Sequence, residues 1–264
     1  MDRRWNTTFA NFRKRAFALI FSLKEIITGN LGHYSSAMTY RFLMVFSSLI
    51  VLLGFLSSFL PFLSPDRVFE LINQILPKYA SSVFEKLQSV YKHRNLGTIL
   101  SVLISYFFVV SYAKMFAKLL SDIVETQIKL REVFLWVFIP IYLLFFSISI
   151  LVGSAFLSFI QAFLPEWLSV LLFIVKIVIF LPIVYFLYWF FLKDLIKPLY
   201  ILEASVYFLL ALNIINFLFS KFVVKLVSLN PLYGLLGSLL LFLIWLELVF
   251  SFLLGAVLYA KRLN

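Results

Sequence analysis

The chain has 264 residues, of which 63% are hydrophobic and only 13% are charged, and its formal net charge is +11. A soluble domain is about half apolar and about one quarter charged, so lipid must solvate much of this apolar surface. The absence of cysteine excludes disulfides and thiolate metal sites, and the only two histidines, His33 and His93, lie on opposite sides of the predicted membrane.

The first thirty residues predict a basic helix in the membrane interface. Apolar residues recur at spacings near three and four between Trp5 and Ile27. Its charge comes from four basic residues, Arg13, Lys14, Arg15 and Lys24. Such a helix buries its apolar face at the headgroup boundary and attracts anionic lipid. The alternative is an ordinary solvated cytoplasmic helix.

Six apolar stretches follow, and each is long enough to cross about 30 Å of hydrocarbon at about 1.5 Å per residue. We predict transmembrane helices at residues 37–60, 96–120, 133–163, 167–192, 199–219 and 232–260. Residues 66–94 are mixed in polarity and predict two short helices on the outer surface, whereas residues 221–231 predict an outer loop. The predicted fold is therefore an all-α membrane helix bundle, a single integral membrane domain over residues 1–264.

The distribution of basic residues predicts the orientation of the bundle. Fourteen Lys and Arg residues fall in the segments on the same side as the two termini, and seven fall in the segments on the opposite side. The remaining two lie inside spans. Because cytoplasmic segments carry an excess of Lys and Arg, both termini are predicted on the cytoplasmic side of the membrane. The basic charge flanks the spans instead of forming a stripe with aromatic residues, so nucleic acid is not expected as a partner.

Polar residues inside the predicted spans are the candidate functional residues. They are Arg41, Lys176, Glu203, Asn213, Asn216 and Glu247. Charge at bilayer depth is costly, and such groups usually face the bundle interior or a water-filled cavity. These six residues are predicted to line one polar cavity. For Arg41 and Glu203, about one turn from the boundary, the alternative is that the side chains reach the headgroup region.

Lys176 and Glu247 lie deepest and are the candidate buried ion pair. Their axial offset is about 8–9 Å by helix rise, which two long side chains could close. Two alternatives remain open. The pair could be a salt bridge that only fixes helix register, or Glu247 could be protonated and hydrogen-bonded to a neighbour.

The motif content argues against catalysis and for close helix packing. The chain has no Walker A loop, no G-x-S-x-G turn and no H-E-x-x-H pair, so neither an enzyme nor a bound cofactor is expected. Small residues four apart, as in Ser251 and Gly255, are typical of closely packed membrane helices.

Two stretches resemble the YihY/BrkB family of bacterial inner-membrane proteins. The first is a Thr-Tyr pair at the entry to the first span, and the second is a Tyr-Gly start with a Trp and a closing Gly-Ala in the last span. The matching residues are Thr39, Tyr40, Tyr233, Gly234, Trp245, Gly255 and Ala256. The family usually has a proline where Ser47 and Ser48 stand, and often a glutamate where Val257 stands.

The resemblance implies a role at the cell envelope. Family members have been linked to envelope integrity, serum resistance and export of lipid or lipopolysaccharide. A ribonuclease label has also travelled with the family, but the chain lacks the His/Asp or metal cluster that nuclease chemistry needs. We expect a transporter or flippase-like protein for an amphipathic envelope component such as a lipid. The alternative is a non-transporting membrane scaffold; the sequence leaves open a homo-oligomer and any envelope partner.

Overall fold

The computed structural model describes residues 2–29, 31–57, 99–128, 133–142, 145, 149, 152–153, 169–227 and 234–264. Six long helices lie within these residues: α1 (Asp2–Thr28), α2 (Leu31–Ser57), α5 (Ile99–Val124), α7 (Ser169–Leu192), α8 (Pro198–Val227) and α9 (Gly234–Leu263). A shorter apolar helix occupies Val133–Tyr142. The described part of the chain contains no strand, as predicted. The outer helices predicted in residues 66–94 lie outside it.

Helices α2 and α8 extend furthest beyond their predicted bounds. Helix α2 begins at Leu31 and not near Ala37, and α8 continues to Val227 through residues predicted as an outer loop. Residues 220–227 contain neither glycine nor proline, so nothing in the sequence stops the helix there. The loop prediction was therefore wrong for that part of the segment.

Three stretches of the described residues are long and apolar enough to cross a membrane. They are Leu103–Val124 in α5, Pro198–Lys221 in α8 and Leu240–Leu263 in α9. Shorter apolar helices occupy Val133–Tyr142 and Ile177–Leu192. These helices are those of a membrane protein, whereas the number of spans stays a prediction.

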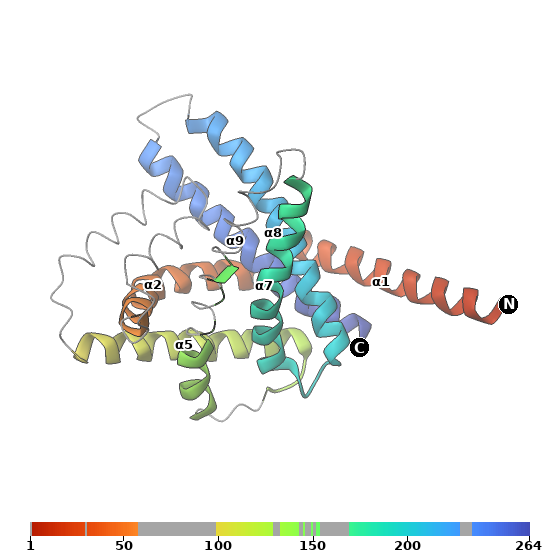
Figure 1. Cartoon of the computed structure of the whole chain (residues 1–264), viewed down its shortest axis with the longest axis horizontal. Coiled ribbons are helices and arrows are strands. Elements are labelled where there is room, and N and C mark those ends of the chain that lie inside the picture. Colours follow the sequence, from red (N-terminus) through yellow and green to blue (C-terminus); the bar gives the residue numbers. More distant parts are fainter. Residues whose placement is uncertain are drawn as a thin grey trace.

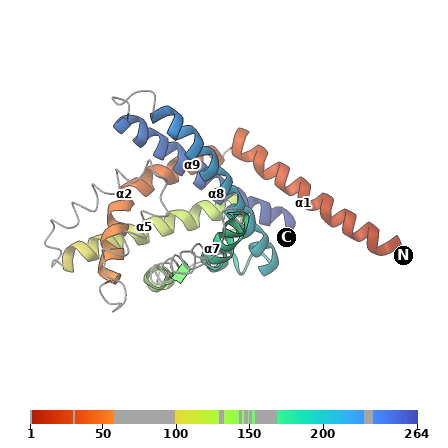
Figure 2. The ribbon, with the colours of Figure 1, turned by 45° about the horizontal axis from the view of Figure 1, so that its top comes forward.

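Helix α9 lies at the centre of the bundle (Figure 1). It packs along α8 on one side and against α2, α5 and the second half of α1 on others. Leu254, Ala256 and Val257 are completely buried as a result. The first half of α1 projects away from the bundle in both views (Figures 1 and 2).

Several helix ends meet at one end of the bundle. Lys261, near the end of α9, donates to the carbonyl oxygen of Ile123 at 3.0 Å and pairs with Glu125 at 3.0 Å. The side chain of Asn264 donates to Leu195 O at 3.0 Å. The C-terminus, the end of α5 and the turn between α7 and α8 therefore lie on one side.

Helix α5 ends through a left-handed residue that is not glycine. Glu125 has φ of 58°, and the N–H of Thr126 donates to Ser121 O at 3.2 Å. This bond satisfies a carbonyl that the helix end would otherwise leave open, as in a Schellman motif. It fixes the end of α5 beside α9, and Lys261 pairs with the same Glu125.

Candidate functional site

A cavity of about 490 Å³ lies between α2 and α5. Its polar lining comes from Arg41 on α2 and from Ser111, Lys114, Lys118 and Asp122 on α5. Ala37, Met115 and Leu119 complete the wall. The volume falls within the range of about 300–1,000 Å³ that small-molecule sites occupy. Arg41, Ser111, Lys118 and Asp122 are exposed, so the cavity is an open groove with room for a small polar group.

The polar lining residues of α5 lie on one face of the helix because of their spacing along the chain. Ser111, Lys114, Lys118 and Asp122 follow one another at intervals of three and four, and residues so spaced lie above one another on a helix. Neighbouring Lys114 and Lys118 are a like-charge pair four apart, which costs a few tenths of a kcal/mol on an isolated helix.

The same face of α5 becomes apolar toward its N-terminus. Leu103, Ile104, Phe107 and Phe108 are exposed there, with Phe107 60% exposed. On α2, Met44 lies one turn beyond Arg41 and is also exposed. By helix rise, Phe107 lies about 16 Å from Lys118. The polar cavity and the start of the apolar surface beyond it together span about half the hydrocarbon thickness.

Glu247 lies in a polar seam between α2 and α9. The hydroxyl of Ser36 donates to a carboxylate oxygen of Glu247. One turn along, Ser251 Oγ donates to Ser35 Oγ at 2.8 Å, and both serines are buried. The hydroxyl of Thr39 donates to Ser35 O at 2.9 Å. The seam joins the two helices through small polar side chains.

The other predicted cavity residues have separate surroundings. Asn216 Oδ1 accepts a 2.7 Å bond from Trp245 Nε1, between α8 and α9. Asn213 donates to Leu209 O of its own helix at 2.8 Å. Lys176 belongs to α7, but its side chain lies outside the described residues, so its predicted pairing with Glu247 stays a prediction. Of the six candidates, Arg41 lines the cavity between α2 and α5.

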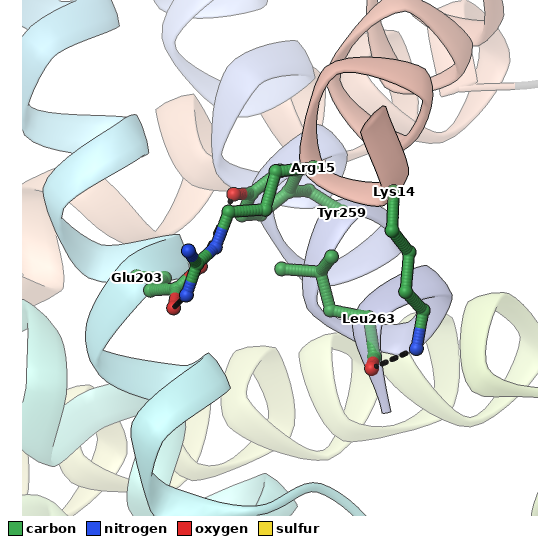
Figure 3. A network of polar contacts seen from close by, with 5 residues as sticks. All are labelled: Lys14, Arg15, Glu203, Tyr259 and Leu263. Carbon is green, nitrogen blue, oxygen red and sulfur yellow. Dashed lines mark hydrogen bonds and ion pairs between the residues drawn. The ribbon is translucent and has the colours of Figure 1, made fainter. Parts of the chain in front are cut away.

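Glu203 on α8 binds the N-terminal helix (Figure 3). Arg15 donates two bonds to its carboxylate, at 2.6 and 3.1 Å, and Tyr259 of α9 donates a third at 3.3 Å. The hydrogen bonds and the charge of Glu203 raise the pKa of Arg15. Lys14 donates to the carbonyl oxygen of Leu263 at 2.7 Å. Paired basic residues of α1 therefore hold it against α8 and α9.

A close approach deeper in the bundle also holds α1. Ser22 donates to the carbonyl oxygen of Gly255 at 2.8 Å, and both residues are buried. A Cβ at Gly255 would lie 2.6 Å from Cδ1 of Ile26 and 3.1 Å from Ser22 Oγ. Only glycine allows the two helices to lie this close without displacing Ile26.

Lys114, Lys118 and Asp122 were not among the residues predicted to line a cavity. Their spacing of four was visible, but the sequence did not show that this face lies opposite Arg41. The family motif residues fall in different places. Thr39 is buried and Tyr40 exposed, Gly234 begins α9, Ala256 is buried, and Tyr233 lies outside the described residues.

The chain matches the model of a known protein family. The family model described as virulence factor BrkB matches residues 22–263, which is nearly the whole chain. No curated protein and no solved structure matches the chain significantly. The matched range includes the cavity between α2 and α5, the seam of α2 and α9, and Gly255. The chain is therefore a member of the BrkB family of membrane proteins.

Proposed function

We propose that this protein is a transporter or flippase-like protein of the bacterial inner membrane that takes up an amphipathic envelope component, such as a lipid, at the α2–α5 cavity. The observation that carries this proposal is the basic cavity that continues into an exposed apolar face on the same two helices. A lipid has that polarity pattern, with a polar headgroup next to an acyl chain. The cavity accepts the headgroup, and Phe107 and Met44 contact the chain.

The orientation of the protein follows the positive-inside bias. The cavity lies in the half of α5 that ends beside the C-terminus, so with cytoplasmic termini it faces the inner leaflet. Lipid would enter there and leave toward the outer leaflet. An N-terminal or C-terminal tag that a membrane-impermeant reagent labels from the periplasm would reverse this direction.

A second candidate function rests on α1. Its first half projects from the bundle (Figure 2), and Phe12, Phe17 and Ile20 are exposed beside basic residues. This surface matches anionic lipid headgroups in charge. As a non-transporting scaffold, the protein would use α1 to hold the membrane surface or an envelope partner, and the α2–α5 cavity would have no transport role.

Lipid translocation in proteoliposomes separates the two functions. The full chain is reconstituted with a lipid labelled on its acyl chain, and loss of label from the outer leaflet is measured after chemical quenching. Arg41→Gln removes one cavity charge, Glu247→Gln tests the seam, and Lys197→Gln removes a charge from the exposed turn before α8. We expect faster translocation with the wild type and Lys197→Gln than with empty liposomes, and slower translocation with Arg41→Gln.

Equal rates in empty and protein-containing liposomes, for every lipid tested, would remove transport and leave the scaffold function. Unchanged translocation in Arg41→Gln would remove the cavity from the transport path. Translocation lost in Glu247→Gln but kept in Arg41→Gln would move the path to the α2–α9 seam.

A further inference from the structure

The polar seam between α2 and α9 joins five oxygen atoms in a continuous row. Ser251 Oγ donates to Ser35 Oγ at 2.8 Å. The hydroxyl oxygens of Ser35 and Ser36 each lie 2.9 Å from the carbonyl oxygen of Gly32. Ser36 Oγ also forms a hydrogen bond with a carboxylate oxygen of Glu247. Of these five residues, Glu247 is the one whose side chain can change its charge by binding a proton.

Glu247 lies well inside an apolar helix. It belongs to the stretch Leu240–Leu263, which is long and apolar enough to cross a membrane. By helix rise it is about 10 Å from Leu240 and about 21 Å from Lys261. Leu240 and Ile244, on the same face of α9, are exposed, so in a bilayer the surface beside the half-buried Glu247 meets hydrocarbon. A carboxylate is costly in that position, and a bound proton removes its charge.

The hydroxyl group of Ser36 can serve both protonation states of Glu247. A hydroxyl has one hydrogen to donate and two lone pairs. When Glu247 is ionised, Ser36 donates to the carboxylate, and Gly32 O keeps its bond from Ser35. When Glu247 is protonated, its O–H donates to Ser36 Oγ, and the Ser36 hydroxyl turns to Gly32 O at 2.9 Å. Both states leave each hydrogen with an acceptor, so a proton can bind without a change in helix packing.

The helices packed against α9 carry other charged and titratable groups. Arg41 of α2 and Lys114 of α5 line the cavity between those two helices, and Glu203 of α8 pairs with α1. His33 is exposed on α2, three residues before Ser36 and therefore near it on the helix surface. Further titratable side chains on these helices are Lys24 and Glu25 of α1, Tyr34 and Tyr40 of α2, Tyr112 of α5 and Tyr207 of α8.

We infer that Glu247 is a proton-binding site in the seam of α2 and α9, with Ser36 as the residue that positions its carboxyl group. A proton from water adds to the carboxylate oxygen that faces Ser36, and the side chain becomes neutral. Glutamate residues inside transmembrane segments are the kind of group that proton relays use. Because the seam is separate from the α2–α5 cavity, Glu247 binds a proton whether or not lipid is carried there.

The test is infrared difference spectroscopy of the full chain in liposomes, titrated from acid to alkaline pH. A protonated carboxyl group has a C=O stretch that is distinct from the carboxylate bands and shifts in heavy water. We expect the wild type to show one such band, lost as the pH rises, that Glu247→Gln lacks. Glu247→Gln should also take up one proton fewer over the same titration. Glu125→Gln removes a carboxyl group that is 82% exposed and should leave the Glu247 band unchanged.

Two further variants separate positioning from folding. Glutamine at position 247 can still donate to Ser36, so Glu247→Gln should keep the wild-type helix content in circular dichroism. Ser36→Ala removes the acceptor of the acid, and we expect the Glu247 band to move to higher frequency and its titration midpoint to change. Ser36→Thr restores a hydroxyl and should restore both values. A band that stays in place in Ser36→Ala would overturn the positioning role.

Three results would overturn the proton site itself. The first is the same acid band in the wild type and in Glu247→Gln. The second is a Glu247 that remains ionised at every pH at which the protein stays folded, as its predicted pairing with Lys176 would require. The third is proton uptake that is lost in His33→Gln but kept in Glu247→Gln, which would assign the proton to the imidazole.

Discussion

Glu203 shows how a carboxylate near the membrane boundary acquires partners from distant parts of the chain. Its position about one turn inside a predicted span indicated that it either lines a polar cavity or reaches the headgroup region. In the folded protein Arg15 and Tyr259 bind it, and both lie far away in sequence. The pairing could not be predicted, because it depends on where α1 docks. The polar seam between α2 and α9 could not be predicted either. Nothing in the sequence around Ser35 and Ser36 indicates that Ser251 and Glu247 are their partners.

We predict that Glu203→Gln loosens α1 without unfolding the bundle. The Arg15 side chain is 50% exposed and that of Glu203 21% exposed, so the ion pair is partly screened and contributes about 0.5–1 kcal/mol. Amide hydrogen exchange of α1 should become a few times faster, whereas exchange in α9 should not change. Asp194→Asn, in the exposed turn before α8, is the control. Unchanged exchange in α1 would show that this pair does not hold the helix.

At the scale of elements, most helices could be predicted because long apolar stretches have few other solutions in a membrane. Their ends were harder to place. Helix α8 continues to Val227 because no breaker stops it, and α5 ends at Glu125, a residue type that rarely adopts a positive φ. The small-residue pattern of Ser251 and Gly255 did predict close helix contact, although not that α1 and α2 supply it.

The contact of α1 with α9 gives an element-scale prediction. Gly255→Ala places a methyl group 2.6 Å from Ile26 Cδ1, so Ile26 must move, at a cost of about 1–3 kcal/mol. The melting temperature in detergent should fall, and α1 should become more sensitive to trypsin, which cleaves after Arg13. Gly32→Ala on α2 meets nothing within 4 Å and should be neutral or raise stability by up to about 1 kcal/mol. Equal behaviour of the two variants would contradict the close approach.

Within the described residues, the molecule combines an apolar helix bundle with a basic cavity between α2 and α5. Composition alone predicted lipid as the solvent. Arg41 was predicted to belong to a cavity, and the cavity it lines is formed with α5. Lys114 and Lys118 of α5 were not among the predicted cavity residues, because the sequence cannot show that α2 lies beside them. The predicted ion pair of Lys176 and the segment 66–94 lie outside the described residues.

The most direct test of lipid uptake at α2 and α5 is photocrosslinking in proteoliposomes. A phospholipid analogue with a photoreactive group in its acyl chain is irradiated with the wild type and with Arg41→Gln, and labelled peptides are located by mass spectrometry. We predict labelling at Phe107 and Phe108 on α5 and near Met44 on α2, reduced in Arg41→Gln. Equal labelling of all lipid-facing helices, including the exposed Ile214 of α8, with no change in Arg41→Gln, would contradict a lipid site between α2 and α5.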